Sequence, residues 1–459
     1  MNPIGVIVLI SFSICTSVEA AQTTTERRAI RNVVIVSVDG LMPASYVAPD
    51  AHGLKVPTLR EMARTGAWSE GVRSVFPSTT LPAHISIATG TNPGTHGIVS
   101  NSALDPLDNR DRRLPWYAED IRVPTLWDAA RARGLRTALV GWPVTVGALG
   151  TVVIPKIWAS ASHDELKLTR ALATPGVLDA VASRFPNFRA GFTPPNIKDE
   201  SLTDIAVHLI ETLRPHLLML SLPQLDLEQH REGPFTPKIL ATIENADREI
   251  ARVMAALKKA GSWDETVLVV LSDHGFARIA QQVSPNVLLT KERLITLDRT
   301  RRVTDWKASV VTSVAHAYVY VRDRSDTQTG KRLLDIFSPL PSKAASGIGR
   351  VYTQEEIRSR GGDPAAYLAL EAATGFSFSG EYHGDYNSPS RSAGAHGFDP
   401  EQPEMRASLL LTGPAIVPGM MQNRGRLIDV APTVARWLGF KMEKAEGGPL
   451  PIALHAPQR

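Results

Sequence analysis

Short apolar runs rich in β-branched residues recur along this chain, separated by segments with helical patterns. The first run, Val33 to Val38, ends at Asp39-Gly40. A run that is apolar on both faces is typical of a buried parallel strand. Four similar runs follow it, at Thr137–Val140, Leu217–Leu222, Thr266–Leu271 and Ser408–Thr412. The alternation predicts an α/β fold with a mostly parallel central sheet and helices on both faces.

The segments between these runs carry helical spacing and helix-ending glycines. The predicted helices are Thr58–Thr65, Thr125–Arg133, Ile239–Lys259 and Asp429–Leu438. Between His274 and His396 the pattern changes to a strand-like Ala315–Val321, a helix-like Lys331–Phe337 and a loop rich in Gly, Ser and Asn. We interpret this stretch as a small α+β cap inserted into the main fold. The predicted division is a catalytic core at 32–280 and 388–459 with an inserted cap at 281–387.

The composition is that of a globular protein rather than a disordered or disulfide-stapled one. The 459 residues are 43% hydrophobic and 21% charged, with 50 basic against 46 acidic side chains and one cysteine. The formal net charge of +4 comes without a long basic run, so no binding to a nucleic-acid duplex is indicated.

The first residues have the pattern of a signal peptide. An apolar run from Ile4 to Cys15 is followed by Val18-Glu19-Ala20, which predicts cleavage after Ala20 and an N-terminal extension at 21–31. The run is short for a membrane span, although an uncleaved anchor is the alternative. We expect a periplasmic or secreted protein with no membrane span in the mature chain.

Carboxylates and imidazoles follow the predicted strands. In an open α/β sheet, ligands bind beyond the carboxyl ends of the strands. Taken singly, such an Asp is most often a helix cap, and an Asp and a His four residues apart are often a surface pair. Together they are a mixed oxygen and nitrogen set that suits two zinc-class ions better than magnesium or calcium. The candidates are Asp39, Asp226, His230, Asp273, His274 and His396.

A hydroxyl cluster precedes another predicted helix. Ser78-Thr79-Thr80 is followed by Pro82, which we expect at the first helical position, and by the helical pattern His84–Ala88. A hydroxyl at a helix N-terminus lies in positive potential, which favours an alkoxide or a nearby phosphate. A simple capping threonine is the alternative. Further on, Asn101 carries an amide able to donate to an oxyanion, or it is a turn residue.

In this order the motifs resemble those of the nucleotide pyrophosphatase/phosphodiesterase family, a branch of the alkaline phosphatase superfamily. The resemblance runs from about Asn32 to Gly439 and is weakest across the cap. It implies an alkaline-phosphatase-like three-layer sandwich. The motifs that carry it are Val36-Ser37-Val38-Asp39-Gly40, Phe76-Pro77-Ser78-Thr79-Thr80, His96-Gly97-Ile98-Val99-Ser100-Asn101, Asp226-x-x-x-His230, Ser272-Asp273-His274-Gly275 and Ala395-His396-Gly397.

The resemblance also implies roles for single residues. Thr80 matches the nucleophile, which also binds metal, and Asn101 matches the residue that steadies a phosphoryl oxygen. His84 matches no ligand and is expected to be structural. The expected ligands of the nucleophile-side zinc are Asp39, Asp273 and His274, and those of the second zinc are Asp226, His230 and His396.

The expected function is that of a two-metal phosphodiesterase or nucleotide pyrophosphatase with a covalent phosphothreonine intermediate. Nucleotide-binding members usually have an aromatic residue after the nucleophile and an Asn two positions further, where this chain has Leu81 and Ala83. Trp158 or Tyr382 could provide base stacking instead. The alternatives are a phosphomonoesterase or phosphonate hydrolase of the same superfamily, or a non-catalytic metal-containing binding protein.

Overall fold

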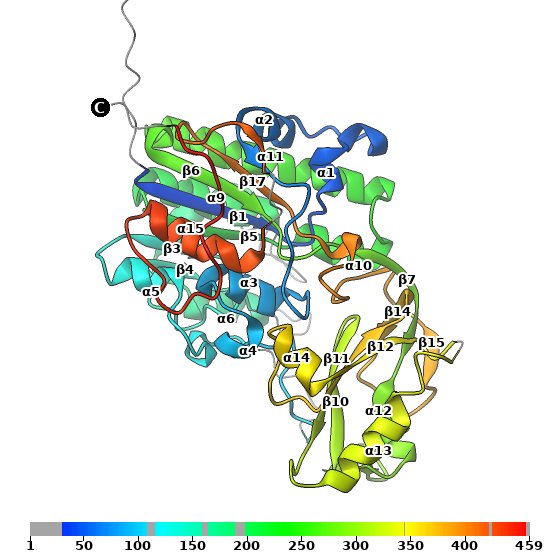
Figure 1. The fold of residues 1–459 in the computed structure, drawn as a ribbon. Coiled ribbons are helices and arrows are strands. Elements are labelled where there is room, and N and C mark those ends of the chain that lie inside the picture. Colours follow the sequence, from blue (N-terminus) through cyan, green and yellow to red (C-terminus); the bar gives the residue numbers. More distant parts are fainter. Residues whose placement is uncertain are drawn as a thin grey trace, which may run out of the picture.

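A large central sheet forms the body of the protein in the computed structural model (Figure 1). Its strand order is β18-β2-β17-β6-β1-β5-β3-β4. Strands β4, β3, β5, β1 and β6 are parallel, whereas β17 pairs antiparallel with β6 and β2. The residues described are 30–107, 115–157, 164–188, 198–343, 345–421 and 425–455.

The bounds of these strands agree closely with the five predicted runs. They are β1 (Asn32–Val38), β2 (Ala67–Trp68), β3 (Thr137–Val140), β4 (Val152–Ile154), β5 (Leu217–Leu222), β6 (Thr266–Leu271), β17 (Leu409–Thr412) and β18 (Gly419–Met420). The short strands β2, β4 and β18 were not predicted, because two or three residues carry too little periodicity to be recognised.

Helices cover both faces of the central sheet, because successive side chains of a strand point to opposite faces and both faces are apolar. In β1, Val34 and Val36 pack in one core with α2, α9 and α11, whereas Val33 and Ile35 pack in a second core with α3, α5 and α15. The predicted three-layer α/β sandwich is therefore confirmed. The bounds are α2 (Pro57–Thr65), α3 (Thr80–Thr89), α5 (Leu126–Arg131), α9 (Asp199–Thr212), α10 (Gln224–Glu232), α11 (Pro237–Lys259) and α15 (Val430–Trp437).

A smaller lobe lies beside the carboxyl edge of the central sheet (Figure 1). It holds an antiparallel sheet of order β10-β11-β13-β12 and a second sheet in which β7 pairs with β14, β15 and β16. Its strands are β7 (Ala277–Val283), β8 (Ile295–Leu297), β9 (Val303–Trp306), β10 (Ala308–Ser313), β11 (His316–Val321), β12 (Ile348–Thr353), β13 (Leu368–Ala372), β14 (Gly375–Phe378), β15 (Asn387–Pro389) and β16 (Gly394–Ala395). Its helices are α12 (Pro285–Lys291), α13 (Thr327–Phe337) and α14 (Gln354–Ser359).

These elements occupy the stretch that we expected to form the cap. Strand β7 begins before residue 281, and strand β16 lies after residue 387. The division of the chain into a core and a cap at 281–387 therefore stays a prediction. The remaining short helices are α1 (Ala44–Val47), η1 (Pro49–His52), α4 (Pro93–His96), η2 (Ala118–Asp120), α6 (Asp164–Leu172), α7 (Val177–Arg184), η3 (Trp263–Glu265), η4 (Pro403–Met405) and η5 (Leu427–Asp429).

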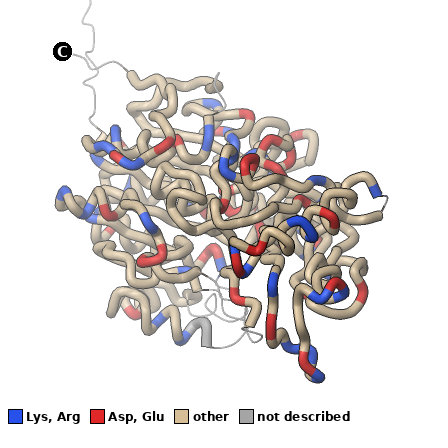
Figure 2. The backbone as a smooth tube through the Cα atoms, turned by 60° about the horizontal axis from the view of Figure 1, so that its bottom comes forward, with Lys and Arg blue, Asp and Glu red and all other residues tan. Residues whose placement is uncertain are grey.

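Basic and acidic residues are interspersed over both lobes in the view of Figure 2. This distribution agrees with the small formal net charge of +4. Within the described ranges, none of the helices combines the length and the apolar character needed to pass through a bilayer. The predicted signal peptide at 1–20 and most of the extension at 21–31 lie outside the described residues.

Candidate active site

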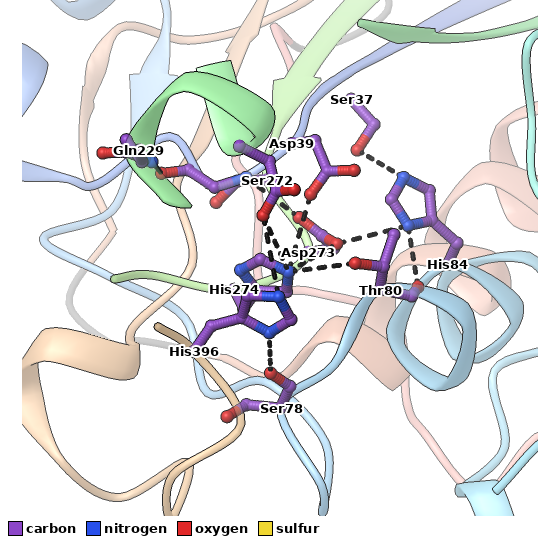
Figure 3. A network of polar contacts seen from close by, with 12 residues as sticks. Ser37, Asp39, Ser78, Thr80, His84, Gln229, Ser272, Asp273, His274 and His396 are labelled. Atoms are coloured by element: carbon purple, nitrogen blue, oxygen red, sulfur yellow. Dashed lines mark hydrogen bonds and ion pairs between the residues drawn. The ribbon is translucent and has the colours of Figure 1, made fainter. Parts of the chain in front are cut away.

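Polar side chains gather at the carboxyl edge of the central sheet, where neighbouring parallel strands end (Figure 3). Asp39 directly follows β1, and Asp273 and His274 follow β6, which pairs with β1. On the other side of β1, β5 leads into α10, which carries Asp226 and His230. Because parallel strands end at one edge, residues far apart in the sequence converge there.

His396 reaches this edge from the other end of the chain. It follows β16, whose pairing with β7 places it beside the segment after β6. Its ring lies parallel to that of His274, with 3.7 Å between the ring centroids and an angle of 9°. The Nε2 atoms of His396 and His230 each lie 3.6 Å from Oδ1 of Asp226. The structure thus brings together Asp226, His230 and His396, the set expected for the second metal.

Backbone carbonyls hold all three imidazoles in one tautomer. A carbonyl oxygen only accepts hydrogen bonds, so each Nδ1 must donate and each Nε2 keeps its lone pair for the cluster. Metal-ligating histidines are usually oriented in this way. The Nδ1 atoms of His230, His274 and His396 lie 3.0, 3.1 and 3.1 Å from the carbonyl oxygens of Gly394, Gly275 and Ser78.

The carboxylates at the centre have buried oxygens without hydrogen-bond partners among the described residues. These are Oδ1 of Asp39 and Oδ1 of Asp226, which lie 3.5 and 4.0 Å from Nε2 of His274. Oδ2 of Asp273 is a third such oxygen and lies 3.1 Å from the same nitrogen. A buried carboxylate oxygen is costly to leave unpaired, and a divalent cation would satisfy it. The donor set therefore fits zinc-class ions.

Asp226 lies between the two predicted ligand sets. Its donor atom lies within 4.8 Å of those of His230 and His396, and also within 4.8 Å of those of Asp39 and His274. We expected Asp39 and His274 to be completed by Asp273, which does contact His274. The sequence did not indicate that Asp226 would border both sets, because this depends on how α10 lies over the sheet edge.

The electrostatics of the cluster call for added positive charge. Burial, together with the charges of Asp273 and Asp226, raises the pKa of Asp39 well above its usual value. Burial, and then the charge of Asp273, raises the pKa of Asp226 to about 8. Burial also lowers the pKa of His274 to about 4, so this imidazole is neutral at neutral pH. A neutral imidazole is the form that ligates a metal, and a bound cation would favour the ionised form of the crowded carboxyls.

Thr80 is the hydroxyl that faces this cluster. Its Oγ1 lies 3.3 Å from Nε2 of His274, at the first residue of α3 (Figure 3). Thr79 is the N-cap residue of α3, and its buried hydroxyl has no partner among the described residues. The expectation that Pro82 occupies the first helical position is wrong. The helix begins two residues earlier, at Thr80, so Pro82 lies at its third position, where its missing N–H is also harmless.

Asn101 lies next to the start of α3. Its side-chain oxygen accepts a hydrogen bond from the backbone N–H of Leu81, with 2.9 Å between the two atoms. This contact fixes the carboxamide through its oxygen, so the Nδ2 group is the part able to donate to a phosphoryl oxygen. The geometry is compatible with the oxyanion role that the resemblance implied.

His84 belongs to neither ligand set, in agreement with its expected structural role. Its Nδ1 lies 2.9 Å from the carbonyl oxygen of Thr80 and 3.4 Å from Oδ2 of Asp273, and its Nε2 lies 3.0 Å from Oγ of Ser37. It therefore links the segment at Thr80 to the loop after β6. A fully buried residue in this position fixes the distance between Thr80 and Asp273.

The sequence reasoning missed one residue at this edge, Lys156. It lies two residues beyond β4, and its Nζ is 3.4 Å from Oδ2 of Asp39. Only 9% of its side chain is exposed. Lys156 follows the pattern of polar residues that come after strands and line the site. It was not identified because the strand Val152–Ile154 was too short to be predicted.

Three residues bear on whether the protein can stack a nucleotide base: Leu81, Tyr382 and Trp158. Leu81 is buried in the core, with 2% of its surface exposed, and so offers no platform to a base. Tyr382 packs against the hydrophobic core of the smaller lobe. Trp158 lies outside the described residues.

Comparisons with known proteins identify the family of this chain. A family model for type I phosphodiesterase / nucleotide pyrophosphatase matches residues 33–399. Human bis(5'-adenosyl)-triphosphatase ENPP4 is 24% identical over 428 residues, covering 90% of this chain and 80% of that protein. Human ectonucleotide pyrophosphatase/phosphodiesterase family member 1 is 26% identical over 250 residues, covering 53% of this chain and 23% of that protein.

A solved structure shows the same fold. Murine ectonucleotide pyrophosphatase/phosphodiesterase 5, an inactive variant in complex with AMP, superposes with a TM-score of 0.65 and 18% sequence identity. The match covers 91% of this chain and 97% of that chain. Since the family model spans most of the chain, the protein belongs to the type I phosphodiesterase / nucleotide pyrophosphatase family of metal-dependent hydrolases.

Proposed function

We propose that this protein hydrolyses phosphodiester or pyrophosphate bonds by a two-metal mechanism with Thr80 as the covalent nucleophile. The observation that carries this proposal is the position of the Thr80 hydroxyl, 3.3 Å from Nε2 of His274 and at the start of a helix. A hydroxyl there faces three carboxylates and three imidazoles. A binding protein would have no need of a buried hydroxyl aimed at such a cluster.

Two metal ions fit the donor set. The unpaired oxygens of Asp39, Asp226 and Asp273 and the lone pairs on the Nε2 atoms of His230, His274 and His396 would supply the ligands, together with the Thr80 oxygen. Zinc is the best candidate because the set mixes carboxylates and imidazoles. When bound, such ions would act as Lewis acids that favour the ionised Thr80 hydroxyl and offset charge on the phosphoryl group.

The chain's own residues then perform two displacements at phosphorus. First, the Thr80 hydroxyl gives up its proton to solvent, Oγ1 forms a bond to phosphorus, and the bond to the leaving group breaks, so that the leaving group departs on the far side and takes up a proton from solvent. Second, water attacks phosphorus and releases one proton, the bond from phosphorus to Oγ1 breaks, and Oγ1 takes up a proton to restore the Thr80 hydroxyl. Asn101 would donate to a non-bridging oxygen in both steps. The helix N-terminus at Thr80 adds positive potential.

The substrate is a phosphodiester or nucleotide-like small molecule. Nucleotides are named for the similar proteins, as a bis(5'-adenosyl)-triphosphatase and as an AMP complex. In this chain the position after the nucleophile is the buried Leu81, so base recognition there is weakened. We propose that the smaller lobe selects among substrates, since the metal-centred residues face only the phosphoryl group. The apolar run Ile4 to Cys15 supports a periplasmic or secreted setting.

One experiment tests the reaction class. Rates are measured on bis(4-nitrophenyl) phosphate, 4-nitrophenyl phosphate and a dinucleoside pyrophosphate, with zinc added and after chelation. The proposal expects turnover of the diester or the pyrophosphate that is lost on chelation and restored by zinc. Denaturing mass spectrometry of a quenched reaction should show a phosphorylated peptide containing Thr80. Zinc-independent turnover, or no turnover of any of the three, would contradict it.

A further inference from the structure

A buried glutamine connects α10, the helix that carries two candidate ligands, to the turn after β1. Gln229, which Figure 3 labels, has 2% of its surface exposed. Its Nε2 donates to the carbonyl oxygen of Gly40, with 3.0 Å between the two atoms. On the same helix, Asp226 lies three positions before Gln229 and His230 one position after it. Residues at these spacings share one face of a helix, so the glutamine lies on the same side of α10 as both candidate ligands.

The residue that Gln229 contacts also bonds to the other ligand set. Gly40 directly follows Asp39 and has a left-handed backbone conformation, with a φ of 73°. Its carbonyl oxygen accepts from Gln229, and its N–H donates to Oδ1 of Asp273, with 3.2 Å between the two atoms. Through its two backbone groups, Gly40 therefore joins α10, the turn after β1 and the loop after β6.

Close packing around Gln229 leaves α10 little freedom to shift. A Cβ atom on Gly40 would lie 2.9 Å from Nε2 of Gln229, and one on Gly394 would lie 2.4 Å from the Gln229 carbonyl oxygen. The carbonyl oxygen of Gly394 also accepts the Nδ1 proton of His230, with 3.0 Å between the two atoms. The helix is therefore held between two backbone segments, and Gln229 supplies the side-chain hydrogen bond to the turn after Asp39.

We propose that Gln229 is a positioning residue that holds Asp226 and His230 against the turn at Asp39 and thereby sets the metal affinity of α10. This inference rests on the proposed two-metal function. Residues that orient metal ligands without touching the ion typically change metal affinity by about 10- to 100-fold when they are replaced. The competing explanation is that the hydrogen bond of Gln229 only stabilises the packing of α10, in which case its loss would lower stability and leave metal affinity unchanged.

A zinc titration separates these two roles. Zinc-loaded wild type and Gln229→Met are titrated with a chelator of known zinc affinity, and the melting temperature of each protein is recorded after chelation. Methionine has nearly the length of glutamine but cannot donate to the carbonyl oxygen of Gly40. The wild type should release two ions. In Gln229→Met, one of the two zinc dissociation constants should rise about 10- to 100-fold, whereas the ion held by Asp39, Asp273 and His274 should bind nearly as in the wild type.

Gln224→Met is the matched control. Gln224 is the same residue type on the same helix, but its Oε1 accepts from the backbone N–H of Asp199 in α9, with 3.0 Å between the two atoms. We expect this variant to have a lower melting temperature, as Gln229→Met does, and to keep both zinc dissociation constants of the wild type. Unchanged zinc binding by Gln229→Met, or equal losses of zinc affinity in the two variants, would overturn the inference.

A second variant covers the case in which Gln229→Met does not fold. Gln229→Asn keeps the amide, which is then one methylene group too short to reach the carbonyl oxygen of Gly40. It should show the same rise in one zinc dissociation constant, and wild-type zinc binding by Gln229→Asn would overturn the inference. A wild type that binds no zinc would instead refute the proposed function.

Discussion

The rings of His274 and His396 stack face to face, with 3.7 Å between their centroids. In the sequence, the strands and helices of the smaller lobe separate the two residues. Each ring donates its Nδ1 proton to a backbone carbonyl and turns Nε2 towards the same carboxylate, Asp226. The stack therefore joins the two predicted ligand sets into one centre. Changes on one side of this centre are expected to affect the other.

Asp226→Asn should remove more metal than a change in one histidine ligand. Oδ1 of Asp226 borders both sets, whereas His230 belongs to one of them. We expect about two zinc ions per chain in the wild type, about one in His230→Asn and fewer than one in Asp226→Asn. Elemental analysis of gel-filtered protein measures this. Equal zinc content in the two variants would mean that Asp226 does not serve both sets.

Thr80→Ala should lower turnover by about 10³-fold or more, because it removes the covalent route and leaves only the remaining electrostatics. Thr80→Ser should keep partial activity, since the hydroxyl survives without the methyl group that restricts its rotamer. Steady-state kinetics on bis(4-nitrophenyl) phosphate measures both effects.

Thr79→Ala is the matched control for this experiment. Thr79 is adjacent to Thr80, yet its hydroxyl has no hydrogen-bond partner among the described residues, so we expect less than about a tenfold loss. If Thr79→Ala abolished turnover and Thr80→Ala did not, the nucleophile would be assigned one residue too late.

Asp199→Asn should stabilise the protein increasingly as the pH rises. Asp199 is buried at the start of α9 and accepts a hydrogen bond from the backbone N–H of Gln224. Burial raises the pKa of Asp199 to about 8. Above the unfolded pKa the unfolded chain ionises while the folded carboxyl stays protonated, so folding loses stability between about pH 4 and pH 8. An amide has no such penalty and can still accept the hydrogen bond.

Urea unfolding at pH 5 and pH 8 measures this effect. The gain of Asp199→Asn over the wild type should be roughly 2–4 kcal/mol larger at pH 8 than at pH 5. The exposed Asp335→Asn in α13 serves as control and should show no comparable gain. A gain that is the same at both pH values would show that Asp199 is not protonated in the folded protein.

The exported protein should begin near Ala21. The apolar run Ile4 to Cys15 followed by Val18-Glu19-Ala20 is the sequence basis for cleavage after Ala20. N-terminal sequencing of the protein from a periplasmic or culture-medium fraction measures this. An intact Met1 in that fraction would show that the segment is retained.

The sequence by itself determined the sheet and pointed to most of the residues that gather at its carboxyl edge. Apolar runs such as Val33–Val38 specify buried strands by local composition, and the polar residue after each run must then lie at the sheet edge. Asp39 and Asp273 could be found in this way, because parallel strands end together. His396, which follows no such run, was found through its motif.

Only the tertiary structure decided how these residues meet. The stack of His396 on His274 depends on the pairing of β16 with β7, which joins distant segments and has no local pattern. The position of Asp226 between both ligand sets depends on the angle of α10. The edge strand β4 brings Lys156 beside Asp39, and this strand is too short to show a periodic pattern in the sequence. Local patterns fix strands and helices, whereas long-range packing fixes the distances on which chemistry depends.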